Sequence, residues 1–384
     1  MDPLKTDCRH FRPDRPCAPH KETGVVCGTC TDDYDPIKTR LLIVKMAAVG
    51  DVLRTTSLLP GIRKRWPGAH ITWITSPGAA PLFRGNALVD RVLTFDGNPP
   101  VELLVERFDV IINPDAAADA CALARLAKGE QRIGFDVDEV GAPIALSPAA
   151  ERWLEMGVRD DKKKANTLTY QEHMAAILEV DYQREPPILE LDEADLAVGV
   201  ALMERHERPD GKLVVGLNTG AGGRWRYKRW TEEGYIELSR RLVADGHQVL
   251  LLGGPEEIER NARLAASVGT GVIETGCENT LREFAGIVEQ CDVVVTGDTL
   301  AMHVGIARGA RVVVLFGPTS LNEIEVFDRG DRIASDLGCL CCYLQDCNVD
   351  PNCMESISPD VVQAAVLSQG EAALSARAGR AASS

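Results

Sequence analysis

The sequence predicts an α/β protein with doubly wound parallel sheets, and three observations carry that prediction. Short apolar, β-branched runs recur, and a turn and a segment of helical spacing follow each of them. The clearest unit lies in residues 291–320, where the run Val293–Val295 breaks at Gly297, a helix starts at Asp298 and the strand Val312–Phe316 follows. The same strand–turn–helix–strand order, the βαβ unit of a parallel sheet, occurs in both halves of the chain.

The first half begins with a buried strand over Leu41–Ala47. A short turn ends at Gly50, Asp51 caps the next helix, and Pro67-Gly68 ends the helical pattern. The region 141–190 is less regular. The remaining elements predicted here are strands at His70–Thr75, Arg91–Phe95, Asp109–Asn113 and Gln131–Phe135, and helices at Ala117–Ala127 and near Tyr170–Leu178.

The second half starts with the strand Leu213–Asn218, which leads into a Gly-rich basic loop and a helix beginning at Thr231. Five strands and four helices then alternate, as in a doubly wound sheet. After the unit of residues 291–320 come a Cys-rich loop and a last helix. The other elements predicted here are strands Gln248–Leu252 and Val272–Glu274, and helices from about Glu256 and from Thr280 to Gln290.

This pattern divides the chain into two Rossmann-like halves flanked by Cys-rich segments. The carboxyl ends of parallel strands face a cleft where phosphorylated ligands bind. Neither G-x-G-x-x-G nor G-x-x-x-x-G-K-[ST] occurs, which disfavours a nicotinamide dehydrogenase and a P-loop hydrolase. The predicted units are an extension (1–36), a first domain (37–190), a second domain (191–337), a Cys-rich loop (338–357), a helix (358–376) and a disordered tail (377–384).

The composition argues against two classes of protein, nucleic-acid binders and membrane-spanning proteins. The net charge of -15, from 57 acidic and 42 basic residues, argues against nucleic-acid binding, which needs basic surface. No apolar run approaches the roughly 18–20 residues of a membrane helix, and the N-terminal residues have no signal-peptide core. We therefore expect a cytoplasmic protein.

The helix start after Val293–Val295 predicts an anion site. Its first backbone N–H groups carry partial positive charge and attract phosphate. Asp298, Thr299 and His303 place a carboxylate, a hydroxyl and an imidazole beside it. A diphosphate joined to a polyol fits this combination.

Cysteines gather at the two ends of the chain. Of twelve cysteines, nine lie there, and since cytosolic disulfides are rare, metal ligation is expected. The N-terminal set has His10 and His20 nearby and suits a zinc knuckle or an iron–sulfur site; free thiols are the alternative. Cys121, Cys277 and Cys291 are expected in or near the core. The terminal cysteines are Cys8, Cys17, Cys27 and Cys30, then Cys339, Cys341, Cys342, Cys347 and Cys353.

Several motifs together resemble one family. Four segments resemble, in this order, glycosyltransferase family nine. They are LLIVKMAAVGDVLRTTSLLPGIRKRWPG, VVGLNTGAGGRWRYKRWTEEGY, VVVTGDTLAMHVGIARGARVVVLFGPT and the ending GCLCCYLQDCNVDPNC. This is the family of the ADP-heptose:lipopolysaccharide heptosyltransferases. The likeness spans roughly residues 40–365 and implies the GT-B fold, with the nucleotide donor in the second domain, the acceptor facing the first, and inversion at the transferred carbon.

The resemblance assigns roles to single residues. Asp51 matches the catalytic base, although an Asp at a helix start is often only a cap. Lys228 matches the K-x-W lysine that contacts the diphosphate without a divalent metal. The other donor-binding residues implied are Thr219, Gly220, Glu257, Asp298, Thr299 and His303.

The chain also departs from the family pattern. Leu300 stands where Gly usually follows the D-T pair, so the donor sugar can differ from heptose; Thr231 replaces a frequent Pro. The set Cys339, Cys342, Cys347 and Cys353 resembles a four-cysteine metal finger of many members, and a metal there is expected to be structural zinc or iron, with no catalytic cofactor.

The leading hypothesis is inverting, metal-independent transfer from a nucleotide-diphospho-sugar, ADP-heptose-like, to a lipopolysaccharide-core-like or other glycan acceptor. The acceptor would be met at the inner face of the membrane, where the helix carrying Arg54 and Arg63–Arg65 could approach anionic lipid. A nucleotide-sugar epimerase on the same fold and a non-catalytic metal-stapled scaffold are the alternatives.

Overall fold

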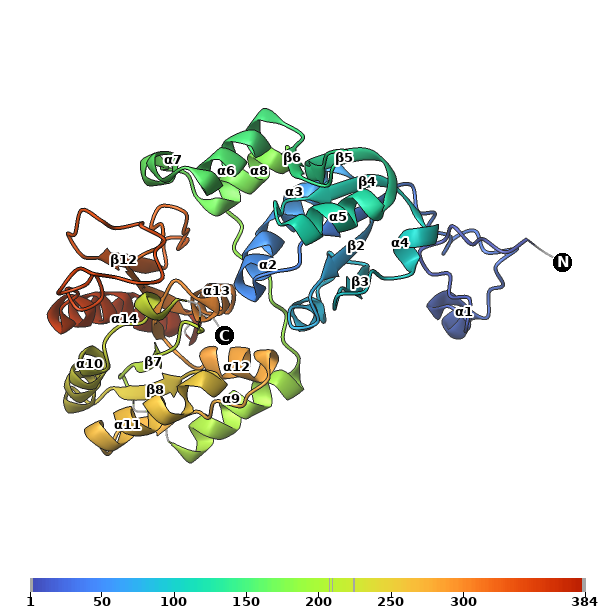
Figure 1. Cartoon of the computed structure of the whole chain (residues 1–384). Helices are drawn as coiled ribbons and strands as arrows, with labels where there is room; N and C mark the ends of the chain where they lie inside the picture. The colour runs from blue at the N-terminus through green and yellow to red at the C-terminus, as the bar shows by residue number, and fades with distance from the viewer. Residues whose placement is uncertain (1–2, 207, 209, 224, 382–384) are drawn as a thin grey trace.

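The computed structural model describes residues 3–206, 208, 210–223 and 225–381. It contains two six-stranded sheets, each the centre of one lobe (Figure 1). The first sheet has the order β3-β2-β1-β4-β5-β6 and the second the order β12-β11-β10-β7-β8-β9. The predicted class, two parallel-sheet α/β units in a GT-B-like arrangement, is confirmed, whereas the domain limits stay predictions.

The first lobe is built on β1, whose residues Leu41–Val44 are completely buried because neighbouring strands and helices cover both faces. All its strand pairs are parallel except β5 with β6. Its strands are β1 (Arg40–Val44), β2 (His70–Thr75), β3 (Arg91–Thr94), β4 (Arg107–Asn113), β5 (Lys128–Val137) and β6 (Pro143–Ala145). Its helices are α2 (Val49–Thr55), α3 (Leu59–Arg65), α4 (Glu102–Val105), α5 (Ala118–Leu126), α6 (Pro148–Val158), α7 (Asp160–Ala165) and α8 (Tyr170–Leu178), with short 3₁₀ turns η1 (Thr56–Leu58) and η2 (Ala80–Phe83).

The second lobe is an all-parallel sheet in which β7 and β10 lie side by side, so their carboxyl ends and the loops after them meet. Its strands are β7 (Val214–Asn218), β8 (Gln248–Leu252), β9 (Val272–Glu274), β10 (Val293–Gly297), β11 (Arg311–Phe316) and β12 (Gly330–Ala334). Its helices are α9 (Glu193–Arg205), α10 (Glu232–Ala244), α11 (Ile258–Val268), α12 (Leu281–Val288), α13 (Leu300–Ala307) and α14 (Pro359–Ala381), with 3₁₀ turns η3 (Arg226–Lys228) and η4 (Pro255–Glu257).

The structure corrects the prediction at several places. The single helix predicted between Asp51 and Pro67 consists of α2, η1 and α3 in succession, and α4, α6, α7 and α9 were not predicted. The edge strands β6 and β12 were not predicted, since both are short and only half-buried and lack an apolar run. The last helix continues to Ala381, past the expected end near Ala376, because Ala and Arg in the expected tail favour helix. Residues 382–384 of that tail lie outside the described part of the chain.

A buried ion cluster ties the lobes together near the connection between them. Arg282 of α12 donates to the Asp195 carboxylate at 2.9 Å and to the carbonyl oxygens of Pro81 (3.0 Å) and Arg84 (3.2 Å) in the first lobe. Asp195, at the start of α9, also pairs with the Arg84 guanidinium. Because both partners of the Arg282–Asp195 pair are 6% exposed, solvent screens it little, and it fixes how the lobes meet.

The N-terminal extension lies on the side of the first lobe that faces away from the second lobe (Figure 1). It contains one short helix, α1 (Ala18–Thr23), and an isolated antiparallel bridge between Cys8 and Pro36. Across the described residues, no helix combines the length and the apolar character needed to cross a membrane.

Candidate functional site

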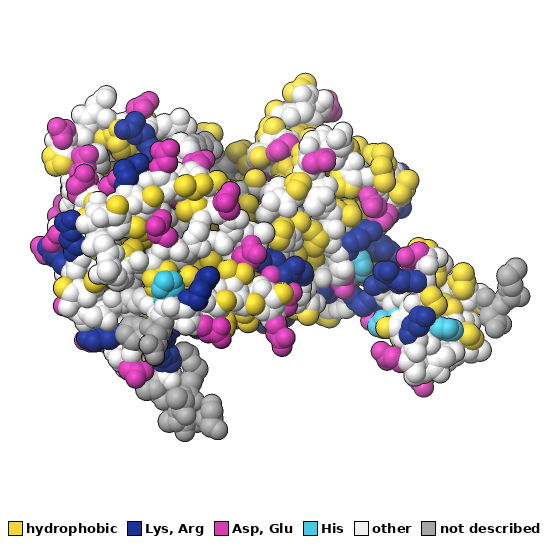
Figure 2. Space-filling model, turned by 90° about the horizontal axis from the view of Figure 1, so that it is seen from below, with side chains coloured by type: hydrophobic (Ala, Val, Ile, Leu, Met, Phe, Trp, Pro, Cys, Tyr) yellow, Lys and Arg dark blue, Asp and Glu magenta, His cyan; other side chains and the backbone are white. Residues whose placement is uncertain are grey.

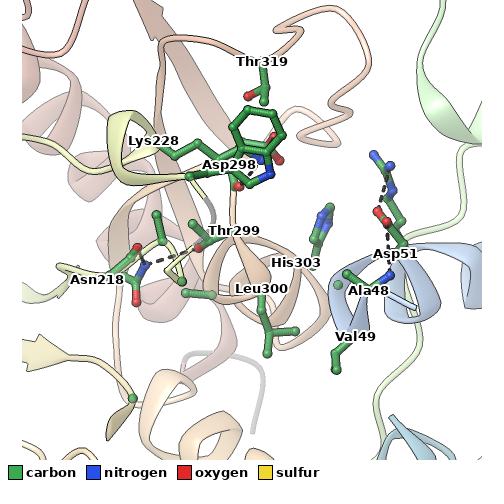
Figure 3. A pocket seen from close by; sticks show the side chains of 18 of the residues that line it. Ala48, Val49, Asp51, Asn218, Lys228, Asp298, Thr299, Leu300, His303 and Thr319 are labelled. Atoms are coloured by element: carbon green, nitrogen blue, oxygen red, sulfur yellow. Dashed lines mark hydrogen bonds and ion pairs between the residues drawn. The ribbon is translucent and has the colours of Figure 1, made fainter. Parts of the chain in front are cut away.

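A cavity of about 720 Å³ opens between the two lobes, and both contribute to its wall. The first lobe supplies the N-terminal end of α2 and the second supplies the loops after β7, β8, β10 and β11. Figure 3 shows Asp51 on one side of this space and Lys228, Asp298 and Thr299 on the other, with His303 between them. The cavity therefore lies where the sequence predicted a cleft, at the carboxyl ends of the strands.

Asp51 occupies the third position of α2, not the capping position that we predicted. Ala48 is the N-cap residue, and the Asp51 carboxylate accepts its backbone N–H at 3.4 Å. The same carboxylate pairs with Arg54, one turn along, at 2.8 Å. Burial acts to raise the pKa of Asp51, but the charges of Arg54 and Lys45 outweigh it and hold the pKa below its ordinary value. Asp51 is thus an ionised carboxylate on the cavity wall.

The lobes touch where Gly50 meets His303. A Cβ added at Gly50 would lie 2.9 Å from Cδ2 of the His303 ring, so only glycine lets α2 approach α13 this closely. The His303 side chain is 6% exposed, and burial lowers its pKa to about 4, with the Arg54 charge acting in the same direction. The imidazole is neutral at pH 7 and lines the cavity beside Asp51.

Lys228 and Asp298 form an ion pair on the opposite wall. The Lys228 ammonium donates to the Asp298 carboxylate at 2.8 Å and to the Asp298 carbonyl oxygen at 3.1 Å. Burial acts to raise the pKa of Asp298, and the Lys228 charge reverses the shift, so the pKa lies below its ordinary value. A Cβ at Gly297 would meet the Lys228 carbonyl oxygen at 2.3 Å, which explains glycine at the end of β10.

The loops after β7 and β8 form the rest of this wall. Asn218 donates through its side-chain amide to Thr299 Oγ1 at 3.2 Å and so joins β7 to the start of α13. Glu257 accepts the Gly254 N–H through Oε2 at 2.9 Å, while its Oε1 is buried with no hydrogen-bond partner among the described residues. Gly220 lies against that carboxylate so closely that an added Cβ would be 2.3 Å from it.

One predicted residue does not reach the cavity. Thr219 is completely buried, and its hydroxyl donates to Asn261 Oδ1 at 2.6 Å. The structure therefore does not present this hydroxyl to a phosphate. Its neighbour Asn218, which the sequence analysis did not select, lines the cavity instead. The other predicted donor-site residues, Gly220, Lys228, Glu257, Asp298, Thr299 and His303, all line the cavity together with Asp51 and Leu300.

A second group of cavity residues was not predicted. The Arg54 guanidinium lies over the Tyr170 ring at 3.6 Å, and its Nε is buried with no hydrogen-bond partner in the described chain. Glu323 accepts a 3.3 Å hydrogen bond from Tyr343 of the Cys-rich loop, and burial raises the pKa of this carboxyl. Arg54 could have been found from its position one helical turn after Asp51. Glu323 and Tyr343 reach the site only through the tertiary fold.

The basic run of α3 contacts the chain itself. Arg63 donates to the Leu88 carbonyl and pairs with Asp90, Lys64 pairs with Asp181 at 2.5 Å, and Arg65 pairs with Glu179 at 2.9 Å. Arg63 and Arg65 are partly buried by these contacts, whereas 71% of the Lys64 side chain is exposed, so the expected contact with anionic lipid stays a prediction.

The cysteine clusters contain no disulfide bonds in the described chain. All twelve cysteines lie in the described part of the chain and none forms a disulfide, and Cys121, Cys277 and Cys291 are buried as predicted. Burial raises the pKa of the Cys353 thiol to about 11, and the neighbouring Cys347 and Cys342 act in the same direction, so these thiols lie near one another. No three His, Cys, Asp or Glu side chains of the described residues are arranged closely enough to hold a single metal ion.

Comparison with known families decides the class. The model of glycosyltransferase family 9 (heptosyltransferase) matches residues 101–351, which is more than half of the chain. The chain belongs to glycosyltransferase family 9. It is a glycosyltransferase, and the family resemblance found in the sequence motifs is confirmed.

Curated relatives match over most of their length. The chain is 24% identical to lipopolysaccharide heptosyltransferase 1 of Pseudomonas aeruginosa over 336 residues, covering 81% of this chain and 88% of the relative. It is 26% identical to lipopolysaccharide heptosyltransferase 1 of Escherichia coli K12, covering 77% and 92%.

Solved structures share the fold of this family 9 enzyme. The crystal structure of a family 9 glycosyltransferase from Veillonella parvula superposes with a TM-score of 0.69 at 17% identity, covering 87% of this chain and 97% of that one. The E. coli ADP-heptose lps heptosyltransferase II gives 0.63 at 21% identity, covering 88% and 99%. The iron-containing dodecameric glycosyltransferase TibC of E. coli gives 0.53 at 12% identity, covering 88% and 77%.

Proposed function

We propose that this enzyme transfers heptose, or a closely similar sugar, from an ADP-sugar to a hydroxyl of a lipopolysaccharide-core glycan, with inversion at the transferred carbon. The curated relatives are named lipopolysaccharide heptosyltransferases, which supports heptose as the sugar and lipopolysaccharide as the acceptor. The observation that carries the proposal is the position of Asp51: an ionised carboxylate faces, across one cavity, a wall of Lys228, Thr299 and the start of α13.

In this proposal Asp51 is the general base. Its carboxylate takes the proton from the acceptor hydroxyl while the oxygen forms a bond to the anomeric carbon and the bond from that carbon to the diphosphate breaks. A single displacement of this kind inverts the configuration. The Asp51–Arg54 pair favours the ionised carboxylate, so the base is ready at neutral pH.

Lys228 and α13 would hold the departing diphosphate. Two N–H donors of the Lys228 ammonium contact Asp298, which leaves a third for a phosphate oxygen. Thr299 caps α13 without a side-chain bond to that helix, and the first N–H groups of α13 carry partial positive charge. Charge stabilisation from these groups would need no catalytic metal.

Glu257 and Leu300 would define the donor. The unpartnered Oε1 of Glu257 suits a ribose hydroxyl, because a buried carboxylate oxygen without a partner costs about 1–3 kcal/mol that such a bond recovers. Leu300 on the cavity wall would narrow the space for the sugar.

We also propose structural zinc or iron at the terminal cysteines. The thiols near Cys353 are neighbours but do not surround a single ion as they stand, so no step of the reaction depends on this metal.

We further propose that the enzyme works at the cytoplasmic face of the membrane, with the acceptor approaching over α7. There Lys163 contacts the Tyr343 ring at the cavity, while Lys162 and Lys164 are exposed. Flotation with anionic vesicles tests that contact.

The reaction is tested with a panel of nucleotide sugars and a lipopolysaccharide-core acceptor lacking heptose. We expect product only when donor and acceptor are both present, and NMR of the product should show the inverted anomer. Turnover of the donor without acceptor would instead support a nucleotide-sugar epimerase. No turnover and no nucleotide binding would support a scaffold.

A further inference from the structure

The N-terminal extension encloses a second cavity, which shares no lining residue with the cavity between the lobes. This cavity has a volume of about 230 Å³. Every cysteine of the extension lines it, and so do both histidines. These residues are Cys8, Cys17, Cys27, Cys30, His10 and His20.

Apolar packing contributes little to the order of the extension. Among the described residues up to 36, only Cys8 and Pro19 are buried, so the segment has almost no apolar core. Segments below about 40 residues usually need disulfides or metals to hold a fold. No disulfide is present among the twelve cysteines, all of which the structure describes. A ligand held by the thiols would supply the missing stabilisation.

Several contacts around the cavity match those of a thiolate-bound metal. The backbone N–H of Lys5 donates to Cys27 Sγ at 3.3 Å, which favours a thiolate at that sulfur. His20 Nδ1 lies 2.8 Å from the Val25 carbonyl oxygen, an arrangement that fixes the orientation of the ring. The side chains of Lys5, Arg12 and Arg15 line the same space and offset negative charge, with Asp33 as the single carboxylate on its wall.

The arrangement of the four thiols favours one kind of metal ligand over another. Four sulfurs around one zinc ion, at about 2.3 Å each, lie within about 4 Å of one another. Among the described residues no three His, Cys, Asp or Glu side chains are placed to hold one metal ion, although all four thiols line one open space. We propose that the thiolates of Cys8, Cys17, Cys27 and Cys30 bind an iron–sulfur cluster, which places several irons between sulfurs that stand apart.

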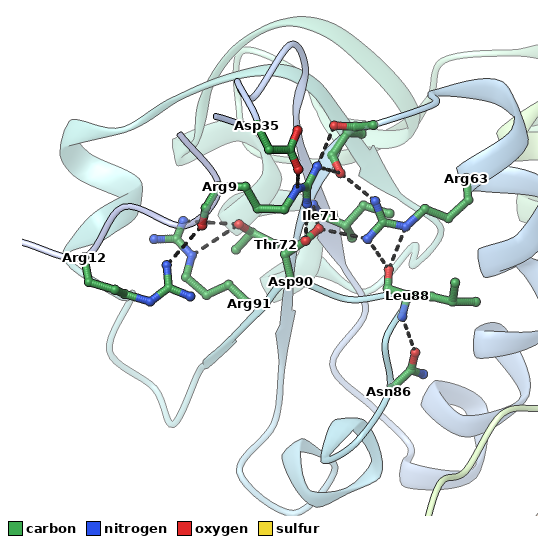
Figure 4. A network of polar contacts seen from close by, with 12 residues as sticks. Arg9, Arg12, Asp35, Arg63, Ile71, Thr72, Asn86, Leu88, Asp90 and Arg91 are labelled. Atoms are coloured by element: carbon green, nitrogen blue, oxygen red, sulfur yellow. Dashed lines mark hydrogen bonds and ion pairs between the residues drawn. The ribbon is translucent and has the colours of Figure 1, made fainter. Parts of the chain in front are cut away.

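The cluster would be structural. Arg9 attaches the extension to the first lobe: it donates to the Gly68 carbonyl at 2.7 Å and pairs with the Asp90 carboxylate. Asp90 also pairs with Arg63 and accepts the Ile71 N–H (Figure 4). Basic side chains gather where the extension joins this lobe (Figure 2). Cys8 is next to Arg9, so a bound cluster would hold this anchor in place.

The test is the composition of the full-length protein purified without oxygen and reconstituted with iron and sulfide. The cluster rests on the proposal of a structural metal at the chain ends, but its composition can be measured without sugar transfer. Failure of this test would therefore leave the proposed transfer reaction untouched. We expect about four irons and about four acid-labile sulfides per chain at this site, with the visible absorption and Mössbauer spectrum of a cluster. Zinc at one ion per chain without sulfide, or no metal after reconstitution, would overturn the proposal.

Variants locate the cluster. Cys17→Ser should lose the iron and sulfide, whereas the double variant Cys339→Ser/Cys342→Ser and the core control Cys121→Ser should keep them. Loss in the Cys339→Ser/Cys342→Ser protein and retention in Cys17→Ser would place the cluster at the other end of the chain and contradict this assignment. Circular dichroism of each variant shows whether the lobes remain folded, and the wild-type composition stands as a readout even where a variant does not fold.

Discussion

The two walls of the interlobe cavity differ in how they carry charge. On the first lobe, Asp51 is a carboxylate on a helix, paired with Arg54 and open to the cavity, with 36% of its side chain exposed. On the second lobe, charge is neutralised inside the Lys228–Asp298 pair, and glycines bring backbone close to the space. One wall is therefore suited to proton transfer and the other to holding a diphosphate. The predictions below test that division, starting with the largest effect.

Replacing the carboxylate should remove catalysis but not donor binding. Asp51→Asn keeps the size of the side chain and eliminates the base, so we expect the transfer rate to fall by about a thousand-fold. The affinity for ADP, measured by calorimetry, should change less than about threefold because the nucleotide contacts the other wall. A variant that still transfers sugar at the wild-type rate would remove Asp51 from the mechanism.

The neutral histidine between the walls should make stability depend on pH. His303 has a pKa of about 4 in the folded protein and about 6.5 when unfolded, so the unfolded state binds its proton first as the pH falls. The free energy of unfolding should therefore decrease by up to about 3 kcal/mol between about pH 6.5 and pH 4. Urea titrations across this range should show a smaller decrease for His303→Gln, and an equal decrease in both proteins would contradict the assignment.

Removing the cation of the second wall should weaken nucleotide binding. Lys228→Ala deletes a charged donor and leaves Asp298 unpaired, so we expect ADP affinity to fall about 10- to 100-fold. Arg226→Ala is the matched control, because this exposed cation lies on the same 3₁₀ turn, over the Tyr227 ring. Calorimetry that finds equal losses in both variants would indicate a general charge effect instead of a contact.

Donor binding should be more sensitive to a side chain at Gly220 than to one at Gly223. In Gly220→Ala the new Cβ would collide with the Glu257 carboxylate, so we expect donor affinity to fall about tenfold through displacement of that side chain. Gly223→Ala is the control, since its Cβ would lie no nearer than 3.6 Å to any described residue that is not its neighbour in the chain. Donor KM values for the two variants should separate; coincident values would mean that Glu257 does not contact the donor.

The smallest expected effect concerns donor choice. Leu300→Ala widens the cavity beside the start of α13 while keeping a residue that favours helix. We expect kcat/KM for ADP-sugars bulkier than the natural donor to rise a few-fold relative to that donor. An unchanged ranking across the donor panel would show that Leu300 does not face the sugar.

Local sequence signals predicted the fold well where an element is buried. The strands β2, β8 and β9 have the predicted bounds because short runs rich in apolar and β-branched residues identify them. Thr231 and Thr280 cap the helices that were predicted to start there. The edge strands β6 and β12 carry no such signal.

The site was predictable only where one motif holds the residue. Asp51, Lys228 and Asp298 stand in short motifs, and all three line the cavity. The orientation of Thr219 depends on Asn261, a residue far along the chain, so no motif could show that its hydroxyl faces inward. Tyr343 likewise reaches the cavity only because the Cys-rich loop folds back over it.

The most direct test of the two-wall account is a crystal structure of the enzyme with ADP and an acceptor glycan. We predict the diphosphate against Lys228 and the start of α13, and the acceptor hydroxyl within about 2.6–3.2 Å of the Asp51 carboxylate. A nucleotide bound to the first lobe, or an acceptor hydroxyl beyond the reach of Asp51, would contradict the account.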